Sequence, residues 1–258
     1  MKKSKKRSNW LTQIKRGIIG LLSVGGLTCL ITYALIWADK TDHFELSRII
    51  LTGQSYLDRN DVIKYADLPR YPILTKIDLT AIQTKLESHP YIKAARISRN
   101  FPQTLRIDII ERNPISYINH SPLYLVDTDG YILPAKNGTI EFDVPMLTGF
   151  NPADELYPIG EKCLSQKINE AVGLLNRIKT QFPSFYEDIS EVIINPKDEY
   201  ELYLSKKPTK IYLGSGDISR QLTILQEFVK SIRGVRSIYD YQYVDLRYWK
   251  QVVVKERV

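Results

Sequence analysis

The feature that most constrains the fold of this chain is an uncharged run, "GIIGLLSVGGLTCLITYALIWA", at residues 17–38. A helix of this length rises about 33 Å, which is enough to cross the hydrocarbon core of a bilayer. Aromatic residues, whose rings favour the membrane interface, lie near both ends of the run: Trp10, Tyr33 and Trp37. The run therefore predicts a transmembrane helix over residues 17–38.

The flanks of the run predict its orientation. The basic tail, residues 1–16, holds seven cations and no acid: Lys2, Lys3, Lys5, Lys6, Arg7, Lys15 and Arg16. The other flank, "DKTDHFE", is acidic on balance, so we expect the tail in the cytoplasm and the main body outside, as in a single-pass type II protein. A cleaved signal peptide is the alternative. It would need a shorter apolar core and a small-x-small cleavage site, which "IWA" before Asp39 fits poorly.

The charge balance argues against nucleic-acid binding. The chain carries 36 Lys and Arg, 29 Asp and Glu, and a net charge of +7. The seven cations of the tail account for this excess, so the rest of the chain is neutral. Binding to DNA or RNA needs a basic face on the folded part. We therefore expect no nucleic-acid partner.

The two cysteines favour an exported body without an intrachain disulfide. Cys29 lies inside the uncharged run and Cys163 is alone beyond it, so the exported part cannot form a bond within itself. We expect Cys163 to be a small buried apolar residue rather than a reactive thiol.

The first unit, residues 44–112, has the predicted order β-α-α-β-β. "FELSRIILTG" predicts a strand, and "DRNDVIKYADLP" and "DLTAIQTKLESHP" predict helices, the second one capped by Asp78. "IKAARISRN" and "TLRIDIIER" predict two strands. In the latter, Leu105, Ile107 and Ile109 alternate with polar residues, as in a half-buried strand.

The second unit, residues 113–258, is predicted to be mainly β with two covering helices. Its strands are predicted in "ISYINH", "LYLVD", "YIL", "EVIIN", "EYELYLS", "TKIYLG" and "YQYVDLRYWKQVVVKE". The first helix has the apolar stripe Leu164, Ile168, Ala171, Val172, Leu175 and Ile178, and the second has Ile218, Leu222, Leu225, Val229 and Ile232. Strands with two helices on one face indicate an α+β fold.

The sequence offers no visible catalytic, cofactor or metal site. His43, His89 and His120 share no metal-ligand spacing, and neither G-x-S-x-G nor S-x-x-K occurs. "LGSGDIS" is better explained as a turn with Asp217 as a helix cap than as a phosphate loop. "DTDG", with Asp127 and Asp129, lacks the other ligands of a calcium loop and predicts a hairpin turn. We therefore expect no enzyme.

Taken together, the basic tail, single span, β-α-α-β-β unit and β-rich unit resemble the bacterial cell-division family FtsQ, called DivIB in Gram-positive organisms. "FELSRIILTG" is similar to the opening strand of the family's POTRA domain. "HPYIKAARISRNFPQTLRIDIIERNPISYI" is the most specific stretch, with the family's Pro-aromatic pair, Arg, aromatic-Pro-x-Thr-Leu and Glu-Arg-x-Pro. They are Pro90-Tyr91, Arg99, residues 101–105 and residues 111–114. "YLVDTDGYIL", "VPMLTGF", "KIYLG" and "YVDLRY" are similar to parts of the family's β domain.

Two departures from the family pattern are visible. Gln54 stands where many members carry Asn, and "WKQVVVKERV" after Tyr248 is bulkier than the small residues often found there. The second departure concerns the residues expected to contact a partner.

The resemblance implies a POTRA domain at 44–112, a β domain at 113–258 and a non-enzymatic scaffold of the division machinery. It further implies partners of the FtsB and FtsL type, small coiled-coil membrane proteins, and a part in controlling septal peptidoglycan synthesis. The POTRA domain would contact other division proteins. The expected location is the cell inner (cytoplasmic) membrane, with the body on the periplasmic or extracytoplasmic side and enrichment at the septum.

The C-terminal stretch "YVDLRYWKQVVVKERV" is the candidate binding site. Val252 and Val254 can belong to the core while the outer edge of the same strand stays open for a partner strand, because a strand has two faces and two edges. Charges at Arg247, Lys250 and Lys255 would protect such an edge from aggregation. We predict a recognition strand that binds by strand addition and comprises Arg247, Tyr248, Trp249, Gln251 and Val253. The resemblance points to the same strand.

Two other functions stay open at this point. A membrane-anchored periplasmic cell-wall hydrolase would need a cleft with a catalytic pair. An export chaperone of the POTRA type would carry repeated β-α-α-β-β units, and one is predicted here.

Overall fold

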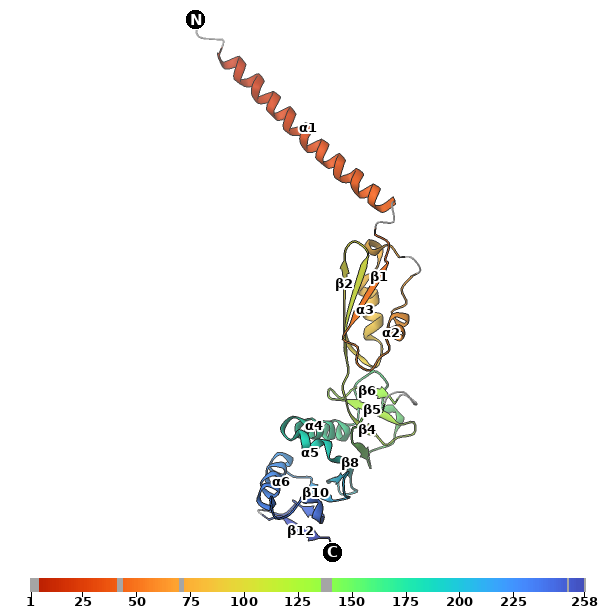
Figure 1. Ribbon diagram of the computed structural model, residues 1–258, viewed down its shortest axis with the longest axis vertical. Coiled ribbons are helices and arrows are strands. Elements are labelled where there is room, and N and C mark those ends of the chain that lie inside the picture. Colours follow the sequence, from red (N-terminus) through yellow and green to blue (C-terminus); the bar gives the residue numbers. More distant parts are fainter. Residues whose placement is uncertain (1–4, 41–43, 70–71, 136–140, 250, 258) are drawn as a thin grey trace.

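The computed structural model describes residues 5–40, 44–69, 72–135, 141–249 and 251–257 and, within the first helix, the side chains of residues 13–37. The molecule is elongated, with the first helix, the first unit and the second unit following one another along its long axis (Figure 1). The two chain ends lie at opposite ends of this axis. Of the cations that we used to predict orientation, Lys2 and Lys3 lie outside the described residues, as do the side chains of Lys5, Lys6 and Arg7.

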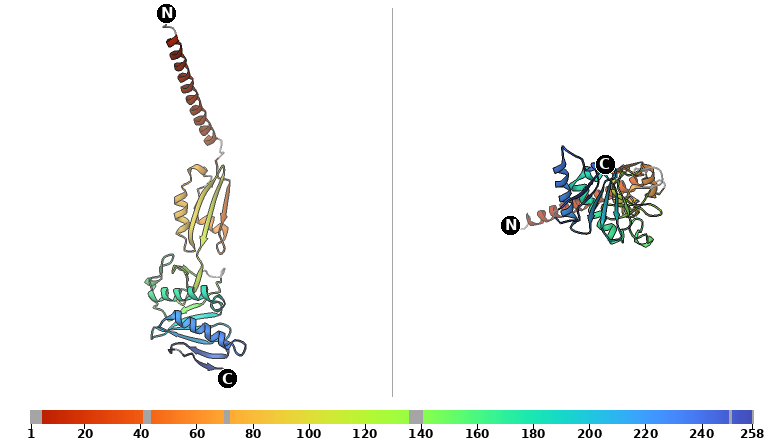
Figure 2. Two further views of the ribbon diagram at one scale, coloured as in Figure 1. Left: turned by 90° about the vertical axis from the view of Figure 1, so that its left-hand side faces the viewer. Right: turned by 90° about the horizontal axis from the view of Figure 1, so that it is seen from below.

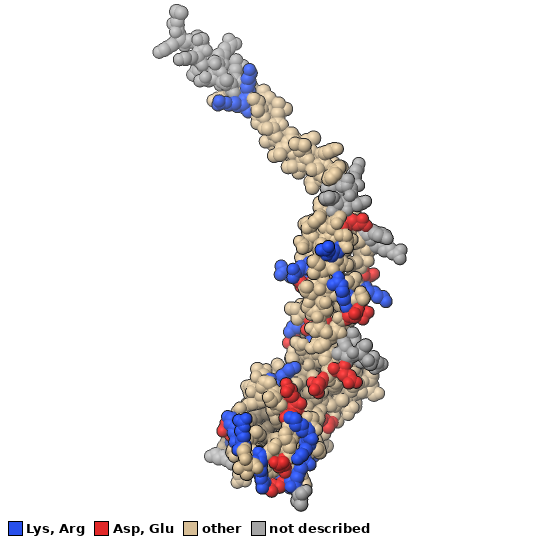
Figure 3. Space-filling model, in the orientation of Figure 1, with Lys and Arg blue, Asp and Glu red and all other residues tan. Residues whose placement is uncertain are grey.

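The first helix, α1 (Lys5–Lys40), contains the predicted span. Its segment 13–37 is long and apolar enough to cross a membrane. Beyond a basic patch near the N-terminal end, Figure 3 shows neither acidic nor basic side chains along the described surface of this helix. On the folded units in the same view, blue and red side chains are interspersed, in line with a neutral body.

The first unit has the predicted β-α-α-β-β order. Its elements are β1 (Arg48–Thr52), α2 (Arg59–Tyr65), the 3-10 helix η1 (Leu74–Lys76), α3 (Leu79–Glu87), β2 (Ile92–Asn100) and β3 (Thr104–Glu111). The sheet has the order β1-β3-β2, with β1 parallel and β2 antiparallel to β3. Both helices lie on one side of it (Figure 2). Asp78 caps α3 as predicted, because its Oδ1 accepts the amides of Thr80 (3.0 Å) and Ala81 (3.1 Å).

The second unit is built on one long mixed sheet of order β12-β11-β10-β9-β8-β7-β4-β5-β6. Its strands are β4 (Pro114–Ile118), β5 (Tyr124–Asp127), β6 (Ile132–Pro134), β7 (Met146–Thr148), β8 (Ile189–Ile194), β9 (Tyr200–Leu204), β10 (Lys210–Gly214), β11 (Tyr241–Asp245) and β12 (Val253–Glu256). Its helices are η2 (Asp154–Leu156), α4 (Gln166–Gln181), α5 (Pro183–Glu187), α6 (Ile218–Ile232) and η3 (Ile238–Asp240). The α+β class is as predicted. The short elements β7 and α5 were not predicted.

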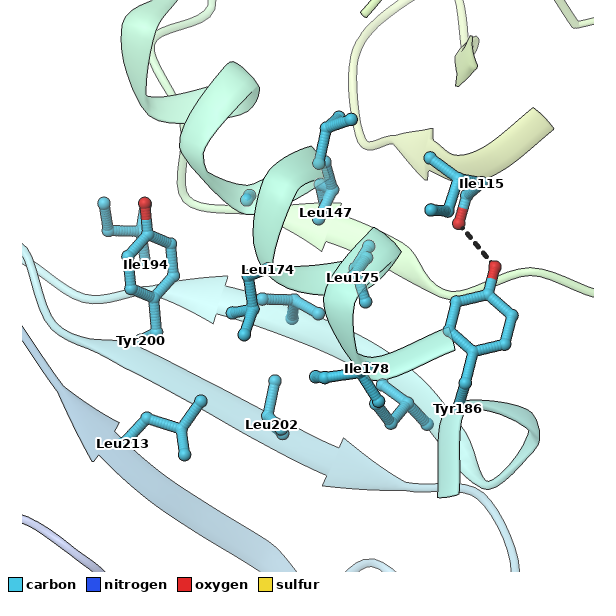
Figure 4. Packing of buried hydrophobic residues seen from close by; sticks show 14 of the residues in the cluster. Ile115, Leu147, Leu174, Leu175, Ile178, Tyr186, Ile194, Tyr200, Leu202 and Leu213 are labelled. Atoms are coloured by element: carbon cyan, nitrogen blue, oxygen red, sulfur yellow. Dashed lines mark hydrogen bonds between the residues drawn. The ribbon is translucent and has the colours of Figure 1, made fainter. Parts of the chain in front are cut away.

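Helix α4 fills the core of the second unit. Its buried side chains Leu174, Leu175 and Ile178 point toward the sheet (Figure 4). The Tyr186 hydroxyl donates to the Ile115 carbonyl (2.7 Å), which ties α5 to β4. Leu164, which we predicted on the apolar stripe of α4, is 66% exposed. It lies outside the helix because the next residue, Ser165, is the N-cap.

Two further predictions about single residues have different outcomes. Cys163 is buried, with 3% of its surface exposed, as predicted. Val229, predicted on the apolar stripe of α6, is 37% exposed. It lines an open apolar hollow between α5 and α6, together with Phe185 and Leu225, rather than the core.

The two units share a hydrophobic core and a polar junction. Leu125 and Leu133 of the second unit pack into the core cluster of the first. The Tyr91 hydroxyl donates to the Pro134 carbonyl (2.7 Å). A buried ion pair joins Arg112 to Asp127 (2.9 Å) within the predicted "DTDG" turn. The junction therefore fixes one unit against the other through packing as well as through the chain.

Candidate interaction edge

Strand β12 forms one end of the long sheet. It pairs antiparallel with β11, with Asp245 opposite Val253 and Val244 opposite Val254. Among the described residues, no strand pairs with the other side of β12. An open strand edge presents unpaired N–H and C=O groups, which makes it a template for a further strand.

The alternation of the backbone determines which groups of β12 face outward. The amide of Arg257 donates to the Asp240 carbonyl (2.9 Å), so it points toward the β11 side. Backbone direction alternates along a strand. The amides and carbonyls of Val254 and Glu256 therefore point away from the sheet, into the space that a partner strand would occupy.

The opposite end of the sheet differs from β12 because it is covered. The Ile132 amide of β6 donates to the Glu161 carbonyl (2.9 Å), and the Ile132 carbonyl accepts the Gly160 amide (2.8 Å). The segment around residues 159–162 thus occupies the outer edge of β6. Of the two end strands of this sheet, β12 is the one whose outer edge is not covered by any described segment.

The C-terminal end of β12 is held in place by arginine contacts. Arg257 donates to the Tyr239 carbonyl (3.2 Å). Arg236, which follows α6, forms an ion pair with Glu256. Val252 and Val254 pack against the core of the second unit, as predicted. The edge is therefore open but fixed in position, which lowers the ordering cost of binding.

The continuous strand predicted across residues 241–256 is wrong. β11 ends at Asp245, and residues 246–252 connect it to β12. The Asp245 carboxylate accepts the Arg247 amide (3.1 Å), which is the two-residue spacing of an Asx turn and breaks the strand. Of the five predicted recognition residues, Val253 lies in β12, whereas the others lie in the connection: Arg247, Tyr248, Trp249 and Gln251.

Arg247 is occupied by intramolecular contacts. Its guanidinium donates to the carboxylates of Asp245 (2.6 Å) and Glu199 (3.1 Å). Hydrogen bonding to Asp245, with a further contribution from Glu199, raises the pKa of Arg247 above its usual value. Its side chain also lies against Gly214, whose φ is +78° and where a Cβ would come 2.9 Å from Arg247 Cγ. Its contact with a partner stays a prediction.

Tyr248 and Trp249 are the exposed aromatic residues of the connection, with exposed fractions of 53% and 70%. The guanidinium carbon of Arg220, on α6, lies 3.6 Å from the ring centroid of Trp249, which is a close cation–π contact. Beside them is a hollow of about 260 Å³. Its lining includes Asp217, Arg220, Gln221, Ile224, Leu246, Tyr248 and Trp249.

The hollow contains a buried acceptor without a partner. Gln221 is 9% exposed, and its Oε1 makes no hydrogen bond among the described residues. An unsatisfied buried carbonyl is costly in a folded protein. This oxygen is itself closed off from solvent, so it does not add a contact for a bound segment.

Residues on α6 are the part of this site that sequence reasoning missed. They reach the connection because β10 and β11 are parallel neighbours joined through α6. A strand, a helix and a second strand in this order are the signature of such a crossover. "KIYLG", the helix and "YQYVD" carried that signal in the sequence.

The other candidate residues are not brought together. Among the described residues, no group of three or more His, Cys, Asp or Glu is placed to hold a metal ion. The His120 ring is nearly buried; it contacts the carbonyl of Pro152 (2.9 Å) and lies beside the exposed Asp154 (3.2 Å). Asp217 caps α6 by accepting the Arg220 amide (3.2 Å), as predicted.

Comparison with protein families gives two matches that together span both units. Residues 44–112 match the FtsQ-type POTRA domain, and residues 113–255 match the domain described as "FtsQ/DivIB, C-terminal related". The chain belongs to the FtsQ/DivIB family. It is thus a member of a family of cell division proteins, and the resemblance seen in the sequence is confirmed.

Curated FtsQ proteins are similar over most of the chain. The cell division protein FtsQ of Geobacter sp. (strain M21) is 26% identical over 257 residues, covering 98% of this chain and 92% of that protein. The protein of the same name from Syntrophotalea carbinolica is 24% identical, covering 93% and 83%. That of Rhodothermus marinus is 26% identical, covering 94% and 88%.

Proposed function

We propose that this FtsQ-family protein is a non-enzymatic, single-span scaffold that links proteins of the bacterial division machinery. The observation that carries the proposal is the open edge of β12, which is fixed in position and flanked by two exposed aromatic side chains. Family membership supports the role in cell division. Such a scaffold acts through binding, and its edge supplies a binding surface.

The partner that fits this edge is an extended segment of a small coiled-coil membrane protein of the FtsB and FtsL type. Strand addition to β12 would use its outward backbone groups for hydrogen bonds, and the side chains of the added strand would determine specificity. Tyr248 and Trp249 are aromatic residues of the kind that dominate binding energy. Through this contact the complex would help to regulate septal peptidoglycan synthesis.

The location proposed for the protein follows from α1 and its basic flank. The span 13–37 would lie in the cell inner (cytoplasmic) membrane with the N-terminus in the cytoplasm. Both folded units would then be periplasmic or extracytoplasmic, and the first unit would contact other division proteins. A fluorescent fusion would give a band at midcell, whereas a uniform envelope signal would contradict the role.

The direct test measures binding of the extracytoplasmic segment of an FtsB- or FtsL-type protein from the same organism. The change Tyr248→Ala should weaken binding by about thirtyfold, because a central aromatic anchor contributes roughly 2 kcal/mol or more. Ile159→Ala, at a 50% exposed position beside β6 at the opposite end of the sheet, is the matched control and should bind as the wild type does. Unchanged binding by a folded Tyr248→Ala protein would refute this assignment of the site.

A further inference from the structure

The end of the first unit nearest α1 carries an aromatic pair, one ring of which is exposed. Phe101, in the turn between β2 and β3, is 58% exposed. Its ring meets that of Phe44 edge-on, with 5.8 Å between centroids. Neither ring belongs to the core cluster of the unit. Phe44 is half-buried, so Phe101 is the ring that this end presents to its surroundings next to α1.

Three segments converge to form this end, which we call the proximal tip (residues 44–47, 72–76 and 100–104). The Leu74 amide donates to the Phe44 carbonyl (2.7 Å), and the Leu46 amide donates to the Pro72 carbonyl (2.9 Å). The Ser47 amide donates to the Gln103 carbonyl (3.0 Å). These bonds hold the aromatic pair on a defined support rather than on a loose loop.

Arg99 strengthens the support from within. Its guanidinium donates to the carbonyls of Leu74 (2.8 Å) and Ile77 (2.6 Å), which fixes η1 against the end of β2. The hydrogen bonds that hold the proximal tip together therefore do not involve the ring of Phe101.

The length of the chain places the proximal tip close to the membrane. Four peptide steps join Lys40, the last residue of α1, to Phe44, and consecutive Cα atoms are 3.8 Å apart. Phe44 therefore lies within roughly 15 Å of the helix end, whatever path the chain takes between them. The turn that holds Phe101 is at the same end, because β1 and β3 are parallel and Arg48 is opposite Thr104. Figure 1 shows this turn beside the end of α1.

We propose that the proximal tip rests on the lipid surface and inserts Phe101 at the interface between headgroups and acyl chains. Aromatic rings are favoured at this depth of the bilayer. The polar surroundings of the ring, including the exposed Arg48 and Lys76, suit the headgroup layer. Such a contact limits the tilt of the extracytoplasmic body above the membrane, beyond what a single-span anchor does.

The experiment uses the full chain in phosphatidylcholine vesicles that contain no other protein. An environment-sensitive NBD fluorophore is attached at Thr75→Cys, an exposed position of the proximal tip, with Cys29→Ala in the background and buried Cys163 retained. A second protein carries the label at Val235→Cys in the second unit. Lipids with spin labels at shallow or deep positions quench the fluorophore in proportion to its proximity.

The proposal expects strong quenching at position 75, stronger by shallow than by deep spin labels, and almost none at position 235. Phe101→Ser should lower the quenching at position 75 toward the level at position 235. Ile110→Ser, a matched change at a 60% exposed apolar position near the other end of β3, should leave it unchanged. Flotation of every variant with the vesicles separately measures whether helix α1 is inserted in the bilayer.

Equal quenching at positions 75 and 235 in vesicles that carry the floated protein would overturn the proposal. So would full quenching at position 75 in a Phe101→Ser protein whose melting temperature matches the wild type. If Phe101→Ser unfolds the first unit, the comparison of shallow and deep quenchers in the wild-type sequence decides instead. A failure to float would contradict the assignment of α1 as a membrane anchor, and not the lipid contact of the proximal tip.

Discussion

At the junction, a buried ion pair links the first unit to the second. Arg112 and Asp127 have side chains that are 9% and 1% exposed, and the guanidinium carbon of Arg112 lies 3.6 Å from the centroid of the Tyr131 ring. Asp127 also accepts the amides of Asp129 (2.9 Å) and Tyr131 (2.8 Å). The sequence identified Asp127 as a turn residue but gave no sign that it neutralises a buried arginine fifteen positions away.

The change Asp127→Ala should lower the free energy of unfolding by about 3–5 kcal/mol, because it leaves the Arg112 charge buried without its partner. Urea unfolding followed by circular dichroism measures this. Asp129→Ala is the control: it removes a surface ion pair with Lys93 (2.6 Å) and should cost less than about 1 kcal/mol. Equal losses for the two variants would contradict the role of the buried pair.

Two buried tyrosines make stability depend on alkaline pH. Burial raises the pKa of Tyr91 and that of Tyr157 from 10.0 to about 12. Since the folded pKa exceeds the unfolded one, this stabilisation is complete below pH 10 and is lost as the pH rises from 10 to 12. Each group should contribute a loss of roughly 2–3 kcal/mol over that interval.

Tyr91→Phe should reduce the slope of unfolding free energy against pH between 10 and 12, as measured by urea titrations at several pH values. Below pH 9 the same variant should be less stable by about 1 kcal/mol, because the Pro134 carbonyl loses its donor. A slope identical to that of the wild type would show that Tyr91 does not titrate on unfolding.

Among the elements, the longer helices and most strands of the described chain follow from local sequence. Apolar periodicity located α4 and α6, and capping residues such as Asp78 marked helix starts. The break between β11 and β12 did not follow, because it depends on one carboxylate that turns the chain within a stretch of β-forming residues. Sequence reasoning thus gave residues 246–252 the wrong conformation, and their role in binding stays a prediction.

The outward backbone groups of β12 can be tested with proline. Glu256→Pro removes an outward amide and should weaken partner binding about fivefold, because one hydrogen bond contributes about 1 kcal/mol. Calorimetric titration with the partner segment measures this. Glu256→Ala is the matched control: it also loses the ion pair with Arg236 but keeps the amide, so the difference in binding between the two variants measures the outward hydrogen bond.

A proline at an inward-facing position of β12 should affect folding instead of partner binding alone. Lys255→Pro removes an amide that faces β11, so it should lower the melting temperature of the second unit rather than act on the partner alone. If Glu256→Pro lowers the melting temperature as much and Lys255→Pro does not, the assigned direction of β12 is wrong.

At the scale of the whole molecule, the shared core predicts that the two units unfold together. Leu133 is fully buried, comes from β6 and packs with the core of the first unit. Leu133→Ala should cost about 2–5 kcal/mol and destabilise both units in one transition. Hydrogen exchange resolved by peptides measures the effect on each unit, with Leu147→Ala in the core of the second unit as the comparison.

Two separate transitions, with that of the first unit unchanged by Leu133→Ala, would contradict the coupling. The sequence predicted two units and their element order but not this shared core. The order of strands in the long sheet was equally out of reach, since β4 lies beside β7 and β7 beside β8 across long connections.

Strand β12 lies at the end of the molecule opposite α1. This position constrains the length of a partner that is anchored in the same bilayer. Such a partner cannot dock near the lipid. If a partner anchored in the same membrane binds the open edge as proposed, its extracytoplasmic segment has to extend along both units before it reaches β12. A partner whose extracytoplasmic segment is shorter than the combined height of the two units would no longer bind the edge, even with every contact residue intact.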